Sequence, residues 1–442
     1  MLVDFSVENF LSFNSRQTIT FEPDTKVKGL EDHYFISVQD KQKGRTLNLL
    51  KIGMIYGANA SGKTNLLKAL NYLKKIALRT KTEKNTPLSF VPFELDYSKN
   101  TSMEVNFISN DTKYNYKIEF NKYSVVYEEL NEYPYLTAGK SKNIYKRTTD
   151  VNKQLSDIEF GKGQNVDPMI AKMLNISTLW NETVLAGFSK ISADIEALRI
   201  VSEWFNDYLE ELMPWQTSLD MLLAEDINDH RVNEADVISA LKRADFNISG
   251  ISIEKRAPLT SYLQDVVESY NGECNIKEAF DVLDDIDSNT VPQIKLKHRT
   301  GQKEYELPYT LESEGTKRYF GLMGILLKLT ESEKFMMIDE LDTSLHPELY
   351  EAFIVSFLKN VRGSQLLFTT HNREFLQKKR MLRKDALWIT DKREDGSTEV
   401  YSFADFDSSV IRDTTSIYNA YSIGKLGGVP NNASDLIFKT EG

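Results

Sequence analysis

One eight-residue segment, residues 57–64, constrains this chain more than any other, because it fits G-x-x-x-x-G-K-[ST] at every position. Its members are Gly57, Ala58, Asn59, Ala60, Ser61, Gly62, Lys63 and Thr64. An apolar run at 52–56 precedes it and an amphipathic pattern at 65–70 follows, which is the order of strand, loop and helix that a phosphate-binding loop needs. The alternative is a chance glycine-rich turn, which the flanking elements disfavour.

The residue types of this segment match the chemistry of a nucleoside triphosphate. Its glycines let backbone N–H groups point inward around phosphates, and the helix that follows presents the positive end of its dipole to them. We expect Lys63 to reach the β- and γ-phosphates, Thr64 to ligate Mg²⁺, and Asn65 to lie beside the nucleotide at the start of the helix. The sequence therefore predicts ATP and Mg²⁺ as cofactors and ATP hydrolysis as the activity.

Length and composition indicate a globular protein with two structural regions. A chain of 442 residues exceeds the ~250–300 at which a single hydrophobic core stops growing. Hydrophobic residues make up 41% and charged residues 27%, which is typical of soluble globular proteins. The net charge of −11 argues against a protein that coats nucleic acid over its whole surface, and it leaves a local basic groove open.

The sequence also indicates where the protein works. Its first residues lack the basic and apolar regions of a signal peptide, and no apolar run approaches the ~20 residues that cross a bilayer. We therefore expect a cytoplasmic protein without membrane contact. The single cysteine, Cys274, leaves no internal disulfide and no multi-cysteine zinc site.

Alternating apolar residues predict strands on both sides of the loop. Residues 1–25 contain two strands, and residues 102–120 form an antiparallel hairpin that turns at Asn110 and Asp111. A further strand is predicted at 124–130. Together these strands and the loop make up a first lobe, residues 1–155. A second hairpin is predicted at 294–307, with a basic face that either follows a phosphate backbone or is simply solvated.

Residues 160–290 change to helical spacing, most clearly between Ile195 and Leu209, where apolar residues recur every three or four positions. We predict an α-helical insertion over residues 156–290 that carries dimer or partner contacts. A second lobe, residues 291–442, follows it. The predicted fold class is α/β, with a mixed sheet, an antiparallel β subdomain and the α-helical insertion.

Two buried strands are predicted to end in catalytic side chains. The run 335–338 leads into Asp339, which suits the magnesium shell, and Glu340, which suits the base that polarises the attacking water. The run 365–370 leads into His371, which is expected to sense the γ-phosphate or to hold the water with Glu340. Alone, an acid pair or a single histidine is often structural, and the phosphate loop favours catalysis here.

Three small residues, Ser313, Gly315 and Thr316, precede an apolar helix that runs through Leu322 and Leu326. Backbone N–H groups and a hydroxyl at a helix N-terminus bind anions. A simple N-cap is the alternative, and taken alone the segment is better explained that way.

The order of these motifs resembles the ABC-type ATPase heads shared by SMC, RecF and OLD-family proteins. It consists of the phosphate loop, the Ser-x-Gly-Thr element, Ile-Asp-Glu, residues 341–347 and a final Thr-His. The segments GANASGKTNLLKAL, ESEGTKRYF, IDELDTSLHPEL and FTTHN are most similar to OLD-like AAA ATPases of bacterial anti-phage defence operons. The resemblance covers residues 1–155 and 290–442.

This resemblance implies a head-to-head homodimer with ATP between the subunits. Ser313, Gly315 and Thr316 of one chain are then expected to complete the other chain's site, which is formed by Lys63, Thr64, Asp339 and Glu340. Asp342 is expected along the dimer seam. One departure from the family pattern is that no glutamine can be assigned to the magnesium-contacting position between the loop's helix and the hairpin. Glu94 occupies that region, so it either substitutes for the glutamine or leaves the contact unmade.

The resemblance also implies a separate effector. OLD nucleases carry a TOPRIM domain after the head, and the segment after His371 is too short for one. Residues 386–390 and 400–403 are instead predicted as strands that close the head sheet. We therefore expect an operon-encoded partner, a TOPRIM or HNH-type nuclease, as in PARIS or Septu systems. The chain is expected to act as an ATP-gated sensor and scaffold that responds to a phage-encoded trigger.

A second hypothesis is a DNA-binding ATPase of DNA repair or maintenance, similar to RecF or SMC proteins. Its DNA binding should weaken steeply with salt. The basic clusters at 378–380 and 383–384 fit such a role, and a solvated helix end is the alternative for them. A transporter motor subunit fits less well, because the inserted hairpins and helices have no place in that design.

Overall fold

The computed structural model describes residues 1–40, 44–136, 139–214, 223, 227, 232–243, 248–256, 291–406 and 417–429. The chain forms two compact units. The first comprises Met1–Trp215, Ser332–Asp342 and Ile354–Gly442, and the second comprises Gln216–Glu331 and Thr343–Phe353. The predicted domain limits at 155/156 and 290/291 differ from the limits of these units. The predicted partner contacts of residues 156–290 stay a prediction.

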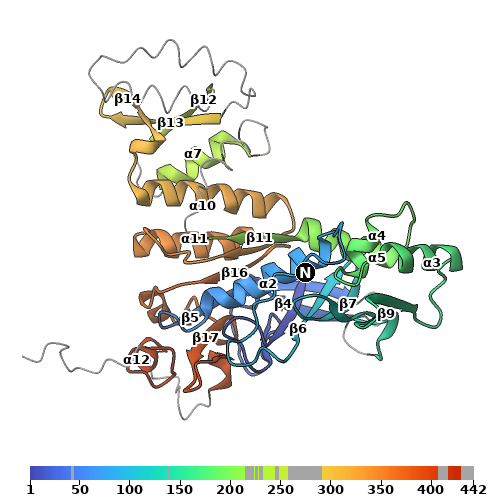
Figure 1. The fold of residues 1–442 in the computed structure, drawn as a ribbon. Coiled ribbons are helices and arrows are strands. Elements are labelled where there is room, and N and C mark those ends of the chain that lie inside the picture. Colours follow the sequence, from blue (N-terminus) through green and yellow to red (C-terminus); the bar gives the residue numbers. More distant parts are fainter. Residues whose placement is uncertain are drawn as a thin grey trace, which may run out of the picture. The chain divides into compact units, whose positions relative to one another are not determined.

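The first unit contains a six-stranded sheet in the order β11-β15-β16-β5-β17-β18 (Figure 1). Its strands are β5 (Ile52–Gly57), β11 (Leu209–Met213), β15 (Phe335–Ile338), β16 (Gln365–Thr369), β17 (Leu387–Lys392) and β18 (Thr398–Ser402). All neighbours are parallel except β17 and β18. The apolar strands β5, β15 and β16 are buried along their whole length, as is typical of parallel sheets covered on both faces.

Parallel pairing brings the carboxyl ends of β5, β15 and β16 to the same edge of this sheet. The phosphate loop follows β5, the acid pair follows β15, and His371 follows β16. Segments far apart in the sequence therefore converge at one edge, which is where open α/β sheets bind ligands. The strands predicted for these runs are confirmed, and so are the two strands predicted to close the sheet, β17 and β18.

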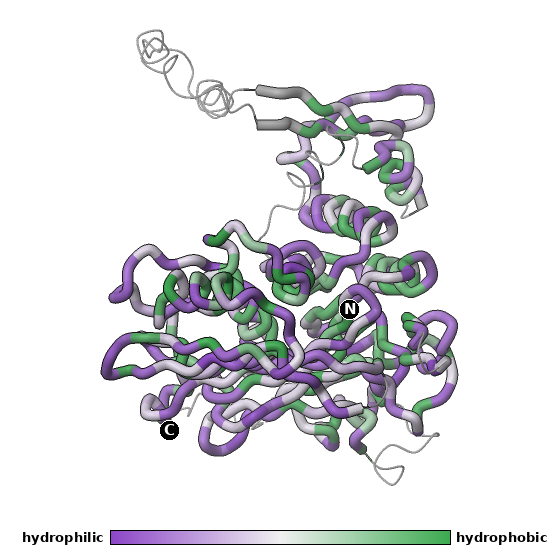
Figure 2. The backbone as a smooth tube through the Cα atoms, turned by 90° about the vertical axis from the view of Figure 1, so that its right-hand side faces the viewer, coloured by the Kyte–Doolittle hydropathy of each residue, from purple (hydrophilic) through white to green (hydrophobic). Residues whose placement is uncertain are grey.

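A second, antiparallel sheet in the same unit has the order β10-β9-β8-β7-β6-β1-β2. Its strands are β1 (Leu2–Glu8), β2 (Gln17–Thr20), β6 (Thr101–Ser109), β7 (Thr112–Phe120), β8 (Val125–Tyr133), β9 (Lys142–Asp150) and β10 (Leu155–Phe160). Asn110 and Asp111 both have positive φ, 48° and 60°, so the predicted β6–β7 hairpin is confirmed with a two-residue turn. Hydropathy alternates along these strands (Figure 2) because one face is buried.

The helices of the first unit include the long helix that begins at the phosphate loop. The helical elements here are α1 (Glu31–Tyr34), α2 (Lys63–Leu78), α3 (Pro168–Ser177), α4 (Val184–Phe188), α5 (Glu196–Glu203), the π-helix η1 (Trp204–Tyr208), η3 (Glu374–Gln377), η4 (Lys384–Ala386), η5 (Phe403–Asp405) and α12 (Ile417–Ser422). Helix α11 spans Pro347–Asn360. Strands β3 (Phe35–Asp40) and β4 (Arg45–Leu50) form a separate antiparallel pair. Among the described residues, no helix is both long and apolar enough to cross a membrane.

The second unit contains an antiparallel sheet of three strands in the order β12-β13-β14. Its elements are α7 (Glu234–Arg243), β12 (Ile248–Arg256), β13 (Val291–Thr300), β14 (Lys303–Pro308), η2 (Tyr309–Leu311) and α10 (Glu314–Glu331). Helix α7 packs against both α10 and β12. The hairpin predicted at 294–307 is confirmed as β13 and β14, with Gly301 at φ +62° in the turn.

Where residues 156–290 are described, the α-helical prediction holds only in part. Helices α3, α4, α5 and α7 lie in this range, but β10, β11 and β12 are strands. Strand β11 begins at Leu209, where the helical spacing ends, and pairs in parallel with β15. The rest of this range, residues 215–222, 224–226, 228–231, 244–247 and 257–290 with Cys274, lies outside the described residues.

A buried ionic cluster attaches the antiparallel sheet to the helices of the first unit. Arg147 on β9 donates to three backbone carbonyl oxygens at 2.6–3.2 Å. Glu128 on β8 accepts hydrogen bonds from the Tyr116 and Tyr145 hydroxyls and from the Val184 N–H at the start of α4. Burial raises the pKa of Glu128, and the nearby Arg147 charge opposes that rise.

We predict that Arg147→Ala lowers the free energy of unfolding by about 3–5 kcal/mol, because it leaves the buried Glu128 carboxylate without its counter-charge. Denaturant titration of the two proteins measures the difference. Lys153→Ala is the control, since it removes only the exposed ion pair to Asp150 and should cost under ~1 kcal/mol. Equal losses in the two variants would contradict a structural role for the buried cluster.

Candidate nucleotide-binding site

The phosphate loop lies between β5 and α2, as the motif predicts. Two glycines permit its close packing. A Cβ on Gly57 would lie 2.5 Å from the hydroxyl oxygen of Thr390. Gly62 has φ +105°, which glycine adopts without strain, and a Cβ there would collide with Thr398. A side chain at Gly57 or Gly62 would therefore collide with neighbouring residues, and at Gly62 it would also strain the backbone.

The N-terminus of α2 is open to an anion. Its N-cap residue, Gly62, contributes no side-chain hydrogen bond, and the first turn holds no acidic residue. Asn59 and Ala60 at the tip of the loop are exposed, and Ala60 has φ +61°. No carboxylate of the helix or of its N-cap therefore occupies the first N–H groups of α2. These N–H groups and the helix dipole suit a phosphate.

Lys63 folds back onto the loop. Its ammonium donates to the carbonyl oxygens of Gly57 and Ala58, each at 2.9 Å. Burial lowers the pKa of Lys63 to about 8, and the negative charges of Glu340 and Asp339 oppose this shift. A phosphate would be a stronger partner for the ammonium than these neutral carbonyl groups.

Hydroxyl groups from distant strands hold the loop in place. Thr398 Oγ1 on β18 donates to the Ser61 carbonyl oxygen at 2.8 Å and lies 2.8 Å from Ser12 Oγ. Ser12 Oγ in turn accepts a hydrogen bond from the Asn65 side chain at 2.9 Å. The Ser61 hydroxyl lies 2.6 Å from Thr390 Oγ1 on β17. The loop is thus fixed by β17, by β18 and by the turn that contains Ser12.

Two threonine hydroxyls hold the Asp339 carboxylate. Thr64 Oγ1 lies 3.0 and 3.1 Å from its two oxygens, and Thr369 Oγ1 donates to Oδ1 at 2.6 Å. The Thr369 oxygen also accepts the Glu340 backbone N–H at 2.7 Å. One buried side chain on β16 therefore positions both acids of the pair.

Glu340, Asp342 and His371 lie around Lys63. Glu340 has φ +48°, a left-handed conformation that costs a residue with a Cβ about 1–2 kcal/mol. The His371 backbone N–H lies 3.2 Å from each carboxylate oxygen of Asp342. Burial and the Lys63 charge lower the pKa of His371 below its ordinary value of 6.5, so its ring is mostly neutral at pH 7. The sheet thus gathers a cation, carboxylates and a neutral imidazole beside the loop.

The residues present fit a magnesium ion. Mg²⁺ usually takes one or two protein oxygens and completes its shell with phosphate oxygens and water. The Thr64 hydroxyl and the Asp339 carboxylate are 3.0 Å apart and supply such a pair. Among the described residues, no group of three or more His, Cys, Asp or Glu side chains is arranged to hold a metal ion.

Ser313, Gly315 and Thr316 lie at the N-terminus of α10 in the second unit. Ser313 Oγ accepts the Thr316 N–H at 3.1 Å and lies 2.8 Å from the Thr316 hydroxyl, which is N-cap geometry. A Cβ on Gly315 would lie 3.0 Å from the Ser344 carbonyl oxygen, so this position is tight. The expected role of these residues in a second chain's site stays a prediction.

Glu94 lies in a loop that the turn around Ser12 holds. The Asn9 side chain accepts the Phe93 N–H at 3.0 Å, and the Glu94 carboxylate accepts a hydrogen bond from the Tyr97 hydroxyl at 2.8 Å. The segment of the expected glutamine and the phosphate loop are thus attached to the same turn. That Glu94 substitutes for the glutamine stays a prediction.

A protein-family model matches residues 53–165 and 192–377, which is more than half of the chain. Its description is "AAA domain, putative AbiEii toxin, Type IV TA system". The chain belongs to this AAA family. The resemblance to AAA ATPases predicted from the motifs is therefore confirmed at the level of this family, and the matched range of the AAA protein contains its phosphate loop, its acid pair and His371. The narrower assignment to OLD-like, PARIS or Septu proteins stays a prediction.

Two solved structures are similar to the AAA protein at low sequence identity. The SMC head domain from Thermotoga maritima is 13% identical, with 91% of this chain and 98% of that chain covered at a TM-score of 0.39. The SMC head bound to the C-winged helix domain of ScpA is also 13% identical, with 91% and 97% covered at a TM-score of 0.40. Among curated proteins, none matches the chain. The description of the fold therefore rests on the strands and their pairing.

Sequence reasoning missed four hydroxyl residues that shape the site, namely Ser12, Thr369, Thr390 and Thr398. Thr369 stands two residues before His371, so its place at the end of β16 was within reach of the strand prediction. The other three come from the turn after β1 and from β17 and β18, where no motif marks them. Only the pairing of these elements brings them to the loop.

Thr369→Val should lower ATP turnover about 10–100-fold while nucleotide affinity changes less than about threefold, because the valine cannot orient Asp339 or accept the Glu340 N–H. Steady-state kcat and KM, together with the Mg²⁺ dependence of kcat, measure the effect. Thr369→Ser keeps the hydroxyl and should restore most of the activity.

Thr149→Val is the matched control for this variant, since the Thr149 hydroxyl donates to the Val125 carbonyl oxygen in the antiparallel sheet. It should leave kcat unchanged. An equal loss in Thr149→Val and Thr369→Val, or no rescue by serine, would rule out the positioning role of Thr369.

ATP affinity should fall as the pH rises above about 8. The pKa of Lys63 in the nucleotide-free protein is about 8, below its ordinary value of 10.5, because the ammonium is buried. Phosphate favours the protonated form, so between pH 8 and 10.5 binding should take up about one proton, and Kd should rise up to about tenfold per pH unit. Calorimetry in buffers of different ionisation enthalpy measures this uptake. Identical heats in all buffers at pH 8.5 would contradict it.

Proposed function

We propose that this AAA protein hydrolyses ATP with Mg²⁺. The observation that carries the proposal is the connected network in which Thr369 joins Asp339 to Glu340 and Thr64 joins Asp339 to the start of α2. A loop that only bound phosphate would not need an acid pair fixed in this way at its side. The membership of the AAA family supports the same reading.

Each residue of the network has a distinct part in this proposal. The N–H groups of the loop and of α2 cradle the phosphates, and Lys63 leaves the Gly57 and Ala58 carbonyl oxygens to bind the β- and γ-phosphates. Thr64 and Asp339 hold Mg²⁺, which neutralises phosphate charge when it is bound. Glu340 accepts a proton from the attacking water, and the neutral His371 ring holds that water or the γ-phosphate.

We propose that two chains form the complete site. In this proposal the start of α10, with Ser313, Gly315 and Thr316, binds the γ-phosphate, and the Thr316 N–H leaves the Ser313 oxygen to which it donates. The resemblance to ABC-type heads supports a head-to-head homodimer in which this element faces the phosphate loop of the partner. Asp342, which accepts the His371 N–H, would then lie next to the seam.

We further propose that nucleotide state controls a separate toxic effector in anti-phage defence. The name of the family refers to a toxin of a type IV toxin–antitoxin system, which supports a role in a two-gene toxic system. The partner expected from the motifs is an operon-encoded nuclease of TOPRIM or HNH type, released by a phage-encoded trigger. The genes beside this one are the first observation to make, since replication genes there would count against the proposal.

A DNA-binding ATPase is the second candidate function. Lys378, Lys379 and Arg380 form an exposed basic run in the first unit, which is a starting point for contacts with phosphates. Duplex DNA added to the turnover assay separates the two functions. Strong stimulation that disappears with salt favours the DNA-binding ATPase, and an unchanged rate favours the effector-controlling one.

Lys63→Ala should abolish ATP binding, and Glu340→Gln should bind ATP normally while turnover falls at least about 100-fold, because the amide cannot accept the proton from water. Turnover per wild-type chain should rise with protein concentration, since two chains make each site. Coupled-enzyme assays over a concentration series and nucleotide-binding calorimetry measure these effects.

In phage challenge, cells with Lys63→Ala should lose protection, and Glu83→Gln, an exposed carboxylate change outside the site, should keep it. A chain that binds no adenine nucleotide would refute the proposed activity. If the ATP turnover rate per chain stays constant when the protein is diluted to monomers, the shared site is refuted.

A further inference from the structure

The free edge of the antiparallel sheet is covered by α3. Strand β10 is the terminal strand of that sheet. The Asn175 side chain accepts the Ile158 N–H at 2.8 Å and donates to the Ile158 carbonyl oxygen at 3.0 Å, so it takes the place of a neighbouring strand. The Ser156 hydroxyl donates to the Thr178 carbonyl oxygen at 2.9 Å. Strand addition is therefore blocked here, and α3 forms the outer surface of this edge.

The outer face of α3 is apolar and exposed. Met169, Met173 and Ile176 recur at helical spacings of four and three, so they share one face of the helix, which the exposed Lys172 borders. Their exposed fractions are 72%, 47% and 74%. Within α3 only Leu174 is buried. Three large apolar side chains on one exposed helix face are typical of a site that another protein covers.

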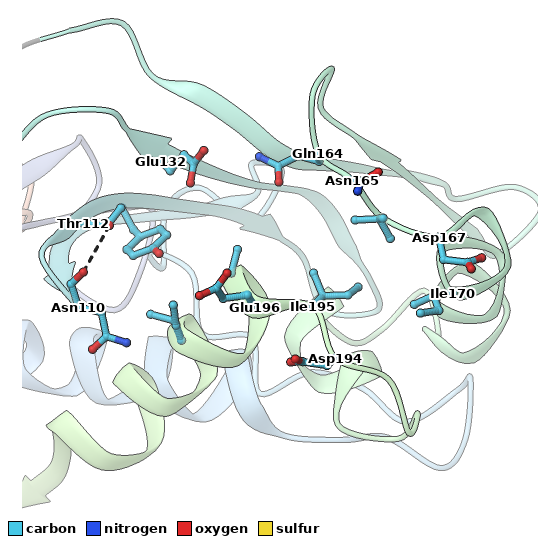
Figure 3. Close-up of a pocket in the computed structure, with 14 residues that line it drawn as sticks. Asn110, Thr112, Glu132, Gln164, Asn165, Asp167, Ile170, Asp194, Ile195 and Glu196 are labelled. Carbon is cyan, nitrogen blue, oxygen red and sulfur yellow. Dashed lines mark hydrogen bonds between the residues drawn. The ribbon is translucent and has the colours of Figure 1, made fainter.

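The same helix borders a cavity of about 590 Å³ in the first unit. Figure 3 shows the residues around it, which come from the β6–β7 turn, β7, β8, the segment before α3, and the start of α5. The lining also includes Asp167, the N-cap residue of α3, and Ile170 in the first turn of α3. Met173 lies one helical turn beyond Ile170, so the apolar residues of α3 come within one turn of a residue that lines the cavity.

The lining of the cavity is acidic and includes no lysine or arginine, and Lys142 lies opposite Glu132 on the neighbouring strand β9. Four carboxylates line it, those of Glu132, Asp167, Asp194 and Glu196. Asp194 pairs with Arg199 at 3.2 Å, whereas Glu132 and Glu196 have no ion-pair partner among the described residues. Both lie close enough to Tyr114 that they add to the effect of burial, which raises the pKa of that phenol to about 12. A cationic side chain is therefore the complementary group for this cavity.

We propose that α3 and the adjoining cavity form a docking surface for a basic amphipathic helix of a partner protein. Its apolar side would cover Met169, Met173 and Ile176, and a lysine or arginine side chain would enter the cavity between Glu132 and Glu196. Charge complementarity favours a basic occupant, and the covered edge of β10 favours a helix over an added strand. None of the residues of this surface belongs to the candidate nucleotide-binding site, so the proposal does not rest on the proposed function.

The probe is a fluorescent synthetic helix of ~14 residues that combines a leucine face with a lysine face, compared with the same peptide carrying glutamate for lysine. Polarisation with the full chain should show binding of the lysine peptide alone, weakened by salt. The double change Glu132→Gln and Glu196→Gln should weaken binding about fivefold, and Met173→Glu about tenfold. Ile423→Glu, at another exposed apolar residue, and Glu83→Gln are the controls and should not alter binding.

Equal binding of the two peptides, or affinities that the three surface changes leave untouched, would overturn the docking surface. A chain that self-associates without peptide and loses this in Met173→Glu would overturn the partner helix in favour of a second copy. ATP turnover of the same samples should stay at the wild-type rate. Lost peptide selectivity with normal turnover thus counts against the docking surface alone, and normal peptide binding without any turnover counts against the proposed function alone.

Discussion

A single carboxylate, that of Asp339, joins the three segments on which the site depends. It meets the hydroxyl of Thr64 at the start of α2 and the hydroxyl of Thr369 at the end of β16. These contacts exist because β15, β16 and β5 lie side by side in parallel and end at one edge. If the register of β16 moved by one residue, Thr369 would point to the other face of the sheet, and the acid pair would lose its support.

The surroundings of the loop extend this dependence to the whole first unit. Thr390 and Thr398 on the closing strands contact Ser61, and Ser12 contacts Asn65 on α2. The turn that holds Ser12 also holds the loop around Glu94 through Asn9. A movement of that turn would therefore shift both the phosphate loop and the segment expected to face the magnesium ion. The turn belongs to the antiparallel sheet, so this sheet is directly connected to the site.

The sequence predicts the central sheet and the order of its functional ends well, because buried parallel strands appear as apolar runs and the phosphate loop has a strict pattern. The pairing of β11 with β15 was not predictable in the same way, since the helical spacing of residues 195–209 continues to the first residue of the strand. The hydroxyl groups of Ser12, Thr390 and Thr398 were also out of reach. They depend on contacts between residues more than 300 positions apart, and serine and threonine are common on any strand.

The Lys63 ammonium donates hydrogen bonds to two carbonyl oxygens of the loop. A ligand must replace both of these hydrogen bonds when the ammonium moves. Free inorganic phosphate offers a single anionic group for that exchange, whereas a triphosphate adds the N–H groups of α2 and the Thr64–Asp339 pair to the balance. Under the proposed function, the loop should therefore bind a triphosphate in preference to free inorganic phosphate.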